Sequence, residues 1–268
     1  MLRQFEELAA VIKETAKGRK IIYIPNPGNR GDGLIRYGTK MFFEDFGIKH
    51  TEATVLGRKG IAQMMPLIIG QRSPLIIYGG GGAWGEAYPG GYKMVRALSR
   101  VTQHILVLPT TFHVDPSRVR GTLFRRDNAE SAKLAPSAKF CHDMAFYAAM
   151  RRDDLGWFNR PAQRAIGLHF RTDRESRITQ SELPDGNVDV SATGNHMDNI
   201  DVFLRELASS DKVVTDRLHV CVGSLICKRP VELYTGNYFK IRAIFESTIG
   251  PFFGEEVELR GDAVPAAH

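Results

Sequence analysis

Short apolar runs alternate with stretches of helical periodicity along most of the chain, and this alternation limits the possible folds more than any other feature. Parallel strands need a crossover connection, which a helix provides, so the repeating order of strand and helix is typical of βαβ units. The predicted strands are 20–25, 51–56, 74–78, 104–108, 122–126, 138–141, 165–170, 212–215 and 230–234. The sequence therefore predicts an α/β fold with parallel sheets covered by helices.

Helical periodicity lies between these strands and at the start of the chain. The predicted helices are 2–16, 34–46, 91–100, 129–134, 196–207, 218–227 and 240–247. The polar segment 151–164 contains Pro161 and predicts a linker between two halves. After Gly250 the signals for regular structure are weak.

Composition excludes several classes of protein. The chain is 43% hydrophobic and 25% charged, with a net charge of +6, as in ordinary globular proteins. No apolar run approaches the length of a membrane span, and the amphipathic N-terminal segment contains acidic residues that a signal peptide lacks. Cys141, Cys221 and Cys227 form no CxxC pair, so we expect no disulfide framework. These features predict a cytoplasmic protein. The dispersed basic residues suit small anionic substrates or a membrane surface, and no nucleic-acid partner is expected.

Two glycine-rich loops follow predicted strands in the first half. In Gly28–Gly33 (GNRGDG), Asp32 is either the N-cap of a helix, worth about 1 kcal/mol, or part of a ligand site at the carboxyl end of the sheet; both can hold together. The loop Gly79–Gly85 (GGGGAWG) contains GxGxxG, but the next strand ends without the acidic residue that binds a dinucleotide ribose. We expect this loop to leave room for a bulky ligand beside Trp84 and Tyr88, whose flat faces suit a sugar ring.

Charged residues follow the strands of the second half. Arg217 and His219 lie in the segment TDRLH directly after a strand, so they either occupy the surface near an Asp216 N-cap or bind an anion at a helix N-terminus. Imidazole can also transfer a proton near neutral pH. Lys240 follows the next strand, and Arg126 ends a strand of the first half. Together they suggest an anionic substrate held between two domains.

Other catalytic classes lack their motifs. The histidines show no HExxH or comparable pairing, so no metal site is predicted. The sequence has no GxSxG nucleophile elbow and no GxxxxGK[ST] phosphate loop.

The order of the motifs resembles that of the polysaccharide pyruvyl transferase family, and most of all its xanthan-type ketal pyruvate transferases. The motifs are GNRGDGLI (28–35), YGGGGAWGE (78–86), VLPTTF (107–112), FRRDNAES (124–131), CHDMAF (141–146), TDRLH (215–219) and PVELYTGNYFKI (230–241). The resemblance implies two Rossmann-like domains, 1–155 and 156–268, facing across a cleft as in GT-B glycosyltransferases. The first would bind the sugar acceptor and the second phosphoenolpyruvate.

The resemblance also implies an activity, the transfer of the enolpyruvyl group of phosphoenolpyruvate to two hydroxyls of one sugar as a cyclic ketal. By position in the motifs, the donor-binding and catalytic residues would be Arg126, Arg217, His219 and Lys240. The expected acceptor residues are Asn29, Asp32, Gly81, Trp84, Glu86 and Asp143, with Asp32, Asp143 and Glu86 as alternative bases. The acceptor would be a polyprenyl-diphosphate-linked oligosaccharide at the inner membrane surface, and no cofactor is expected.

The expected residues suit this chemistry. A carboxylate and a phosphate on one substrate require several cations, and His219 can supply a proton as general acid. One alternative is a GT-B-like glycosyltransferase that binds the diphosphate of a nucleotide sugar through Arg217 and Lys240. Another is a non-catalytic carbohydrate-binding protein, which would bind sugar without turnover.

Overall fold

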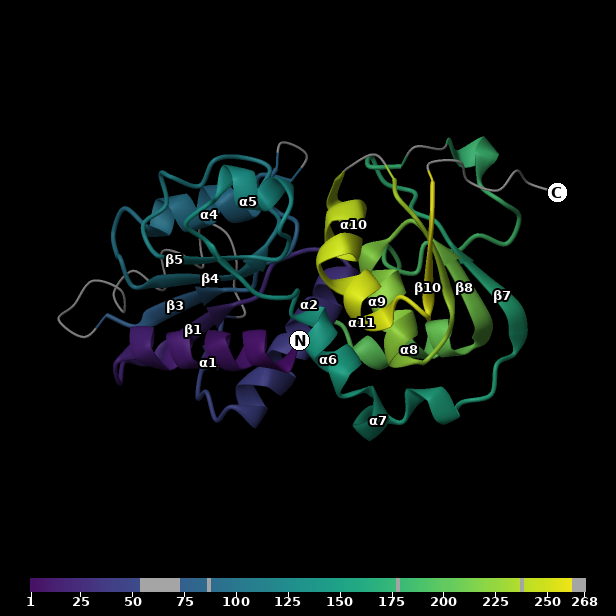
Figure 1. The fold of residues 1–268 in the computed structure, drawn as a ribbon, viewed down its shortest axis with the longest axis horizontal. Helices are drawn as coiled ribbons and strands as arrows, with labels where there is room; N and C mark the ends of the chain where they lie inside the picture. The colour runs from purple at the N-terminus through teal and green to yellow at the C-terminus, as the bar shows by residue number, and fades with distance from the viewer. Residues whose placement is uncertain (54–72, 86–87, 177–178, 237–238, 262–268) are drawn as a thin grey trace. The chain divides into compact units, whose positions relative to one another are not determined.

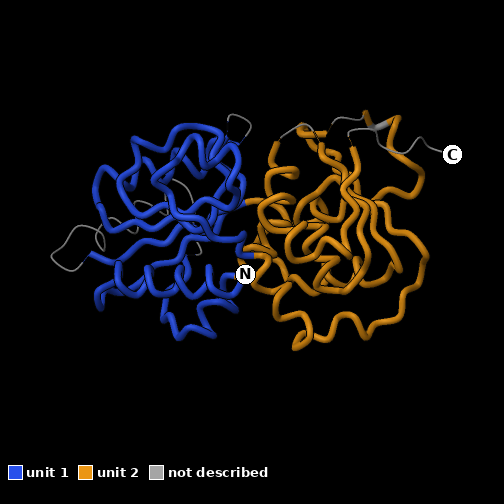
Figure 2. Tube along the Cα trace, viewed as in Figure 1, with its two compact units in different colours: residues 1–27, 39–144 blue, residues 28–38, 145–268 orange. Residues whose placement is uncertain are grey.

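A computed structural model describes residues 1–53, 73–85, 88–176, 179–236 and 239–261 (Figure 1). The chain forms two compact units (Figure 2): unit 1 comprises residues 1–27 and 39–144, and unit 2 comprises residues 28–38 and 145–268. Helix α2 (Arg30–Asp45) is divided between them, because its first nine residues, 30–38, group with unit 2.

Unit 1 is built on a six-stranded parallel sheet of order β2-β1-β3-β4-β5-β6. Figure 1 shows α1 on one side of this sheet and α4 and α5 on the other. Besides α2, the elements are α1 (Leu2–Ala16), β1 (Ile21–Ile24), β2 (Thr51–Glu52), β3 (Leu75–Tyr78), α4 (Gly90–Leu98), β4 (Ile105–Thr110), β5 (Thr122–Arg125), α5 (Glu130–Leu134) and β6 (Lys139–Phe140).

Burial explains the composition of these elements. Every residue of β1 (IIYI) and β3 (LIIY) is buried, because a parallel sheet covered on both faces needs apolar side chains at all positions. Helix α1 instead buries a single stripe that includes Phe5, Leu8 and Ile12.

Unit 2 contains a four-stranded parallel sheet of order β10-β9-β8-β7. Helix α9 (LHVCVGSLI) is apolar almost all round because it packs against α6, α8 and the sheet. The elements are α6 (Ala145–Met150), α7 (Arg152–Leu155), η1 (Trp157–Asn159), β7 (Arg164–His169), η2 (Gln180–Glu182), α8 (Ile200–Ala208), β8 (Ser210–Thr215), α9 (Leu218–Ile226), β9 (Val231–Tyr234), α10 (Phe239–Ile244), η3 (Phe245–Ile249), α11 (Gly250–Phe253) and β10 (Val257–Arg260).

The α/β fold with parallel sheets is therefore confirmed, with local corrections. Strand β4 does not end before Pro109 but runs on to Thr110. The pairing with β5 is irregular between Val107 and Thr110, so no regular hydrogen bond from the nitrogen of Pro109 is needed there. The segment after Gly250 contains α11 and β10, and β10 pairs with β9. Its strand signal is short because only one side chain of this edge strand is fully buried.

Candidate active site

The carboxyl ends of β7 and β8 bring two charged segments of unit 2 together. The strands are parallel, with His169 opposite Thr215, so the residues that follow them emerge side by side. The backbone N–H of Arg171 donates to Asp216 Oδ1 at 2.8 Å, and Thr215 Oγ1 donates to the carbonyl of His169 at 2.7 Å. Ligands of open parallel sheets bind at this edge.

Arg217 lies in the turn between β8 and α9, where it is the N-cap residue of the helix. Its Nη2 donates to Asp189 Oδ2 at 2.6 Å and to Asp173 Oδ2 at 2.8 Å. Burial of the guanidinium, which is only 6% exposed, opposes its charge, but Asp189 and Asp173 outweigh this effect and raise its pKa. Arg217 is therefore a permanent cation at the predicted position.

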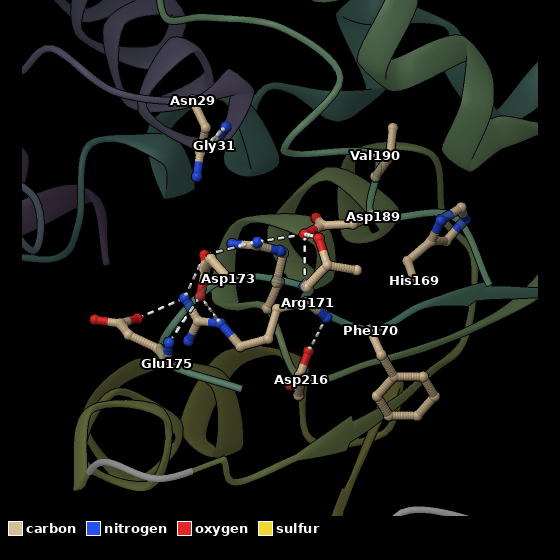
Figure 3. A network of polar contacts seen from close by, with 12 residues as sticks. Asn29, Gly31, His169, Phe170, Arg171, Asp173, Glu175, Asp189, Val190 and Asp216 are labelled. Carbon is tan, nitrogen blue, oxygen red and sulfur yellow. Dashed lines mark hydrogen bonds and ion pairs between the residues drawn. The ribbon is translucent and has the colours of Figure 1, made fainter. Parts of the chain in front are cut away.

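Arg171 is a second cation of this network, and sequence reasoning missed it (Figure 3). Its Nε lies 3.0 Å from Asp173 Oδ1, and its Nη2 lies 2.5 Å from Glu175 Oε2. The same Glu175 oxygen lies 3.7 Å from Lys240 Nζ, so the predicted lysine belongs to this cluster. The available signal was the charge pattern of HFRTDRE directly after a strand.

Four carboxylates accompany these cations, and sequence reasoning considered only Asp216 among them. Asp189 Oδ2 accepts from both the backbone N–H and the hydroxyl of Thr172, at 2.8 and 3.0 Å. Burial raises the pKa of Asp216, against the opposing hydrogen bond from the Arg171 backbone. Figure 3 shows Arg171 among Asp173, Glu175 and Asp216, so cations and carboxylates are interleaved.

His219 lies in the first turn of α9, close to Gly31 in the first turn of α2. A Cβ placed on Gly31 would lie 3.1 Å from both Cβ and Nδ1 of His219. The two motifs, GNRGDG and TDRLH, therefore meet within unit 2. A side chain at position 31 would therefore require Asn29 and the imidazole to shift by a few tenths of an ångström.

The start of α2 is fixed by a reciprocal pair of side chains. Asn29 Oδ1 accepts the Gly31 N–H at 2.8 Å, and Asp32 Oδ2 accepts the Asn29 N–H at 3.1 Å. The N-cap is therefore Asn29, and the expectation that Asp32 occupies that position is wrong. Helix α2 begins at Arg30, earlier than the predicted residue 34, because this cap satisfies its first N–H groups.

The same loop is tied to the segment 191–198 of unit 2. The Arg30 N–H donates to the carbonyl of Ser191 at 3.1 Å, and the His196 N–H donates to the carbonyl of Gly28 at 3.0 Å. Asn29 and Asn195 form an antiparallel bridge. These bonds explain why 28–38 groups with unit 2.

In unit 1, the predicted Arg126 and Asp143 form a buried ion pair. Arg126 Nη1 bonds to Asp143 Oδ2, and Arg126 Nε donates to Thr111 Oγ1 at 2.7 Å. Both side chains are at most 1% exposed. A charge this deep requires such a partner.

The rest of FRRDNAES also carries structure. Asp127 Oδ1 accepts the N–H groups of Ala129 and Ser131 at 3.2 and 3.0 Å, which satisfies the start of α5. Ser131 Oγ donates to Asp127 and accepts the Phe112 N–H at 2.9 Å. The motif thus joins the ends of β4 and β5.

The glycine loop after β3 is packed against the backbone of unit 1. A Cβ on Gly79 would lie 2.8 Å from the Asn26 nitrogen, and one on Gly80 only 2.5 Å from the Pro109 oxygen. Gly81 has φ +96° and bridges to Thr110. Close approach and positive φ therefore account for these glycines without a ligand.

Trp84 is fully buried, and its ring makes edge contacts with Phe112 and Tyr92, at centroid distances of 5.1 and 5.4 Å. The indole is thus part of the core of unit 1, and Tyr88 is 36% exposed. The predicted Glu86 lies outside the described residues. Within the described part of the chain, no three His, Cys, Asp or Glu side chains gather as metal ligands, and no helix has the length and apolarity to cross a bilayer.

Unit 2 thus places a cluster of cations, each paired with carboxylates, at the carboxyl edge of a parallel sheet. The family model for polysaccharide pyruvyl transferases matches residues 29–231, and the chain belongs to that family. Membership makes it a transferase and indicates pyruvyl transfer to a polysaccharide.

A solved structure shares the fold. A functionally uncharacterised protein from Klebsiella pneumoniae superposes with a TM-score of 0.76 at 22% identity, covering 98% of this chain and 100% of its own. This similarity supports the fold alone. No curated protein matches the chain.

Proposed function

We propose that this protein transfers the enolpyruvyl group of phosphoenolpyruvate to two hydroxyls of one sugar, forming a cyclic pyruvate ketal and releasing phosphate. The observation that carries the proposal is the group of cations Arg171, Arg217 and Lys240 at one sheet edge of unit 2, in a chain of this family. The carboxylate and phosphate of the donor need such a group. No cofactor takes part.

The reaction begins with protonation of the methylene carbon of phosphoenolpyruvate, and we assign this proton to His219. Protonation leaves an oxocarbenium-like centre at the neighbouring carbon, which one sugar hydroxyl attacks. The bond to the phosphate oxygen then breaks, and the second hydroxyl closes the ketal. Of the two hydroxyl protons, one restores His219, and the other is accepted by a carboxylate base and passed to the departing phosphate. Arg217 and Lys240 bind the anionic groups and stabilise the departing phosphate.

For the base that accepts a hydroxyl proton, we favour Asp32 over Asp143. The Asp143 carboxylate is fully buried and already bonded to Arg126 Nη1, so accepting a proton there would disrupt a buried ion pair. Asp32 follows Gly31 in the first turn of α2, and a Cβ on Gly31 would lie 3.1 Å from His219. Arg126 in donor binding, and Asn29, Gly81, Trp84, Glu86 and Asp143 in acceptor binding, stay predictions. So do the polyprenyl-diphosphate carrier and the inner membrane surface.

The test is phosphate release from phosphoenolpyruvate by the purified protein, with a panel of lipid-linked and synthetic mannosides, glucosides and galactosides. We expect acceptor-dependent release and a product heavier by the pyruvate ketal. His219→Ala should lower turnover at least about 100-fold. His104→Ala serves as the control, because His104 precedes β4 in unit 1, away from the residues assigned to the reaction. Near-normal turnover of His219→Ala would contradict its role. Failure of the wild-type protein to bind phosphoenolpyruvate would overturn the proposal.

A further inference from the structure

The cations assigned to the donor already carry counterions. Arg217 contacts the carboxylates of Asp173 and Asp189 through the same nitrogen, Nη2. Arg171 contacts Asp173 and Glu175. An incoming dianion or trianion therefore meets positive groups that nearby carboxylates neutralise. For the donor to bind tightly, one of these carboxylates must move away from its arginine.

The two carboxylates on Arg217 differ in their burial. Asp189 is 5% exposed in its side chain, and its Oδ2 accepts two bonds from Thr172 as well as the bond from Arg217. Movement of Asp189 would break three hydrogen bonds in a buried setting, and buried polar groups without partners are costly. Asp189 is therefore the fixed partner of the guanidinium.

Asp173 is the exchangeable partner. Its carboxylate accepts bonds from Arg171 Nε and Nη2 at 3.0 and 3.3 Å, from the Glu175 N–H at 3.0 Å and from Arg217 Nη2 at 2.8 Å. Its side chain is 27% exposed, however, so water can replace the bonds that Asp173 gives up when it moves. Desolvation would raise its pKa, but the charges of Arg171 and Arg217 lower it, so the group is a carboxylate at neutral pH. A carboxylate shared by two guanidinium groups has the charge and planar shape of the donor's own carboxylate.

The guanidinium of Arg217 also has a donor group that is not hydrogen-bonded to the described residues. Its Nε–H is buried and has no acceptor among the residues that the structure describes. A bidentate anion could engage Nε and a terminal nitrogen together, which Asp173 and Asp189 on Nη2 alone do not.

We propose that Asp173 occupies the position of an anionic group of the donor on Arg217 and is displaced when the donor binds, whereas Asp189 holds Arg217 in place throughout. Both are positioning residues that act through Arg217. The inference rests on the proposed function, because it takes phosphoenolpyruvate as the ligand of this cluster. When no donor is bound, the side chain of Asp173 therefore occupies the donor site of this protein.

Opposite effects of two isosteric substitutions test this inference. Calorimetric titration with phosphoenolpyruvate should give about tenfold tighter binding for Asp173→Asn, because a competing negative charge a few ångströms from the ligand is removed. Asp189→Asn should bind about tenfold more weakly, because its guanidinium is no longer oriented. Asp185→Asn, an exposed site on the same unit, removes one negative charge elsewhere and should stay within about twofold of wild type.

Kinetics separate exchange from a merely structural role. Asp173→Asn should lower the KM for phosphoenolpyruvate with little loss of kcat, and inorganic phosphate should inhibit it at lower concentration than wild type. Asp173→Ser should act in the same direction if the asparagine variant misfolds by circular dichroism. Equal or weaker binding by folded Asp173 variants, with wild type binding normally, overturns the inference alone. Absence of binding by wild type overturns the proposed function instead.

Discussion

Replacing Asp143 with Asn should expose the cost of the buried charge of Arg126. The substitution keeps the shape of the side chain but removes the negative charge next to a guanidinium that is 1% exposed. Thr111 Oγ1, at 2.7 Å from Nε, would still accept a bond from the side chain of Arg126. Removing one partner of a buried ion pair costs about 3–5 kcal/mol.

That cost is a large part of the total stability of a protein, which is about 5–15 kcal/mol. With a urea dependence of roughly 2 kcal/mol per molar, Asp143→Asn should lower the midpoint of unit 1 unfolding by about 2 M. Urea titration followed by circular dichroism measures this shift. The double variant Arg126→Met, Asp143→Leu should recover most of the loss, because apolar residues of similar volume replace such pairs at little cost.

The same variant tests whether Arg126 binds the donor. If it does, phosphoenolpyruvate should stabilise Asp143→Asn more than wild type, since the ligand supplies the missing anion. The double variant should not respond through this site. A midpoint within about 0.5 M of wild type would refute the reasoning on the ion pair. Equal stabilisation of wild type and Asp143→Asn would remove Arg126 from donor binding and leave the ion pair intact.

Three further predictions concern single side chains. Burial, with a smaller contribution from the N-terminal amino group, lowers the pKa of His142 to about 4, so the unfolded chain binds more protons between pH 6.5 and 4. Stability should therefore fall by up to about 3 kcal/mol as the pH drops through this window, and urea titrations of His142→Gln should lack that loss. Gly31→Ala should shift the pH–rate profile and lower kcat about tenfold or more, because its Cβ would crowd His219. Gly33→Ala is the control, since its Cβ would meet His196 at an ordinary 3.5 Å. Equal rates for the two variants would contradict the closeness of Gly31 to His219. Ser131→Ala leaves the buried Phe112 N–H without its acceptor and should cost about 1–3 kcal/mol in chemical denaturation, whereas an unchanged midpoint would show that the bond is dispensable.

Most of the regular structure could be predicted because strands buried on both faces carry an unambiguous local signal. The run IIYI and the run LIIY are each apolar at every position, and both are central strands of unit 1. Arg217 could be placed for the same reason, since it follows a buried strand and precedes an apolar helix. The edge strand β10, half of whose side chains are exposed, lacked such a signal.

The missed residues lie where no periodicity exists. Asp173, Glu175 and Asp189 belong to the irregular segment between β7 and α8, and their partners are set by the pairing of β7 with β8. The contact between Gly28 and His196 spans 168 residues of sequence. No local pattern reports a pairing over that distance, so the sequence assigned GNRGDG and TDRLH to two different domains, whereas both belong to unit 2.

Glycines illustrate how a residue type can indicate two opposite things. Gly79 and Gly80 are small because neighbouring backbone lies within 3 Å of where a Cβ would be, so they are explained by the sheet itself. Gly31 lies in the first turn of a helix, where alanine would be about 1 kcal/mol more stable, and what its Cβ would meet is Asn29 Oδ1 and the His219 side chain. Gly31 lowers the stability of its helix, and a Cβ there would crowd the imidazole to which we assign the proton transfer. It is therefore better evidence of function than the four consecutive glycines 79–82. The acceptor is therefore best sought first around Gly31 and His219 in unit 2.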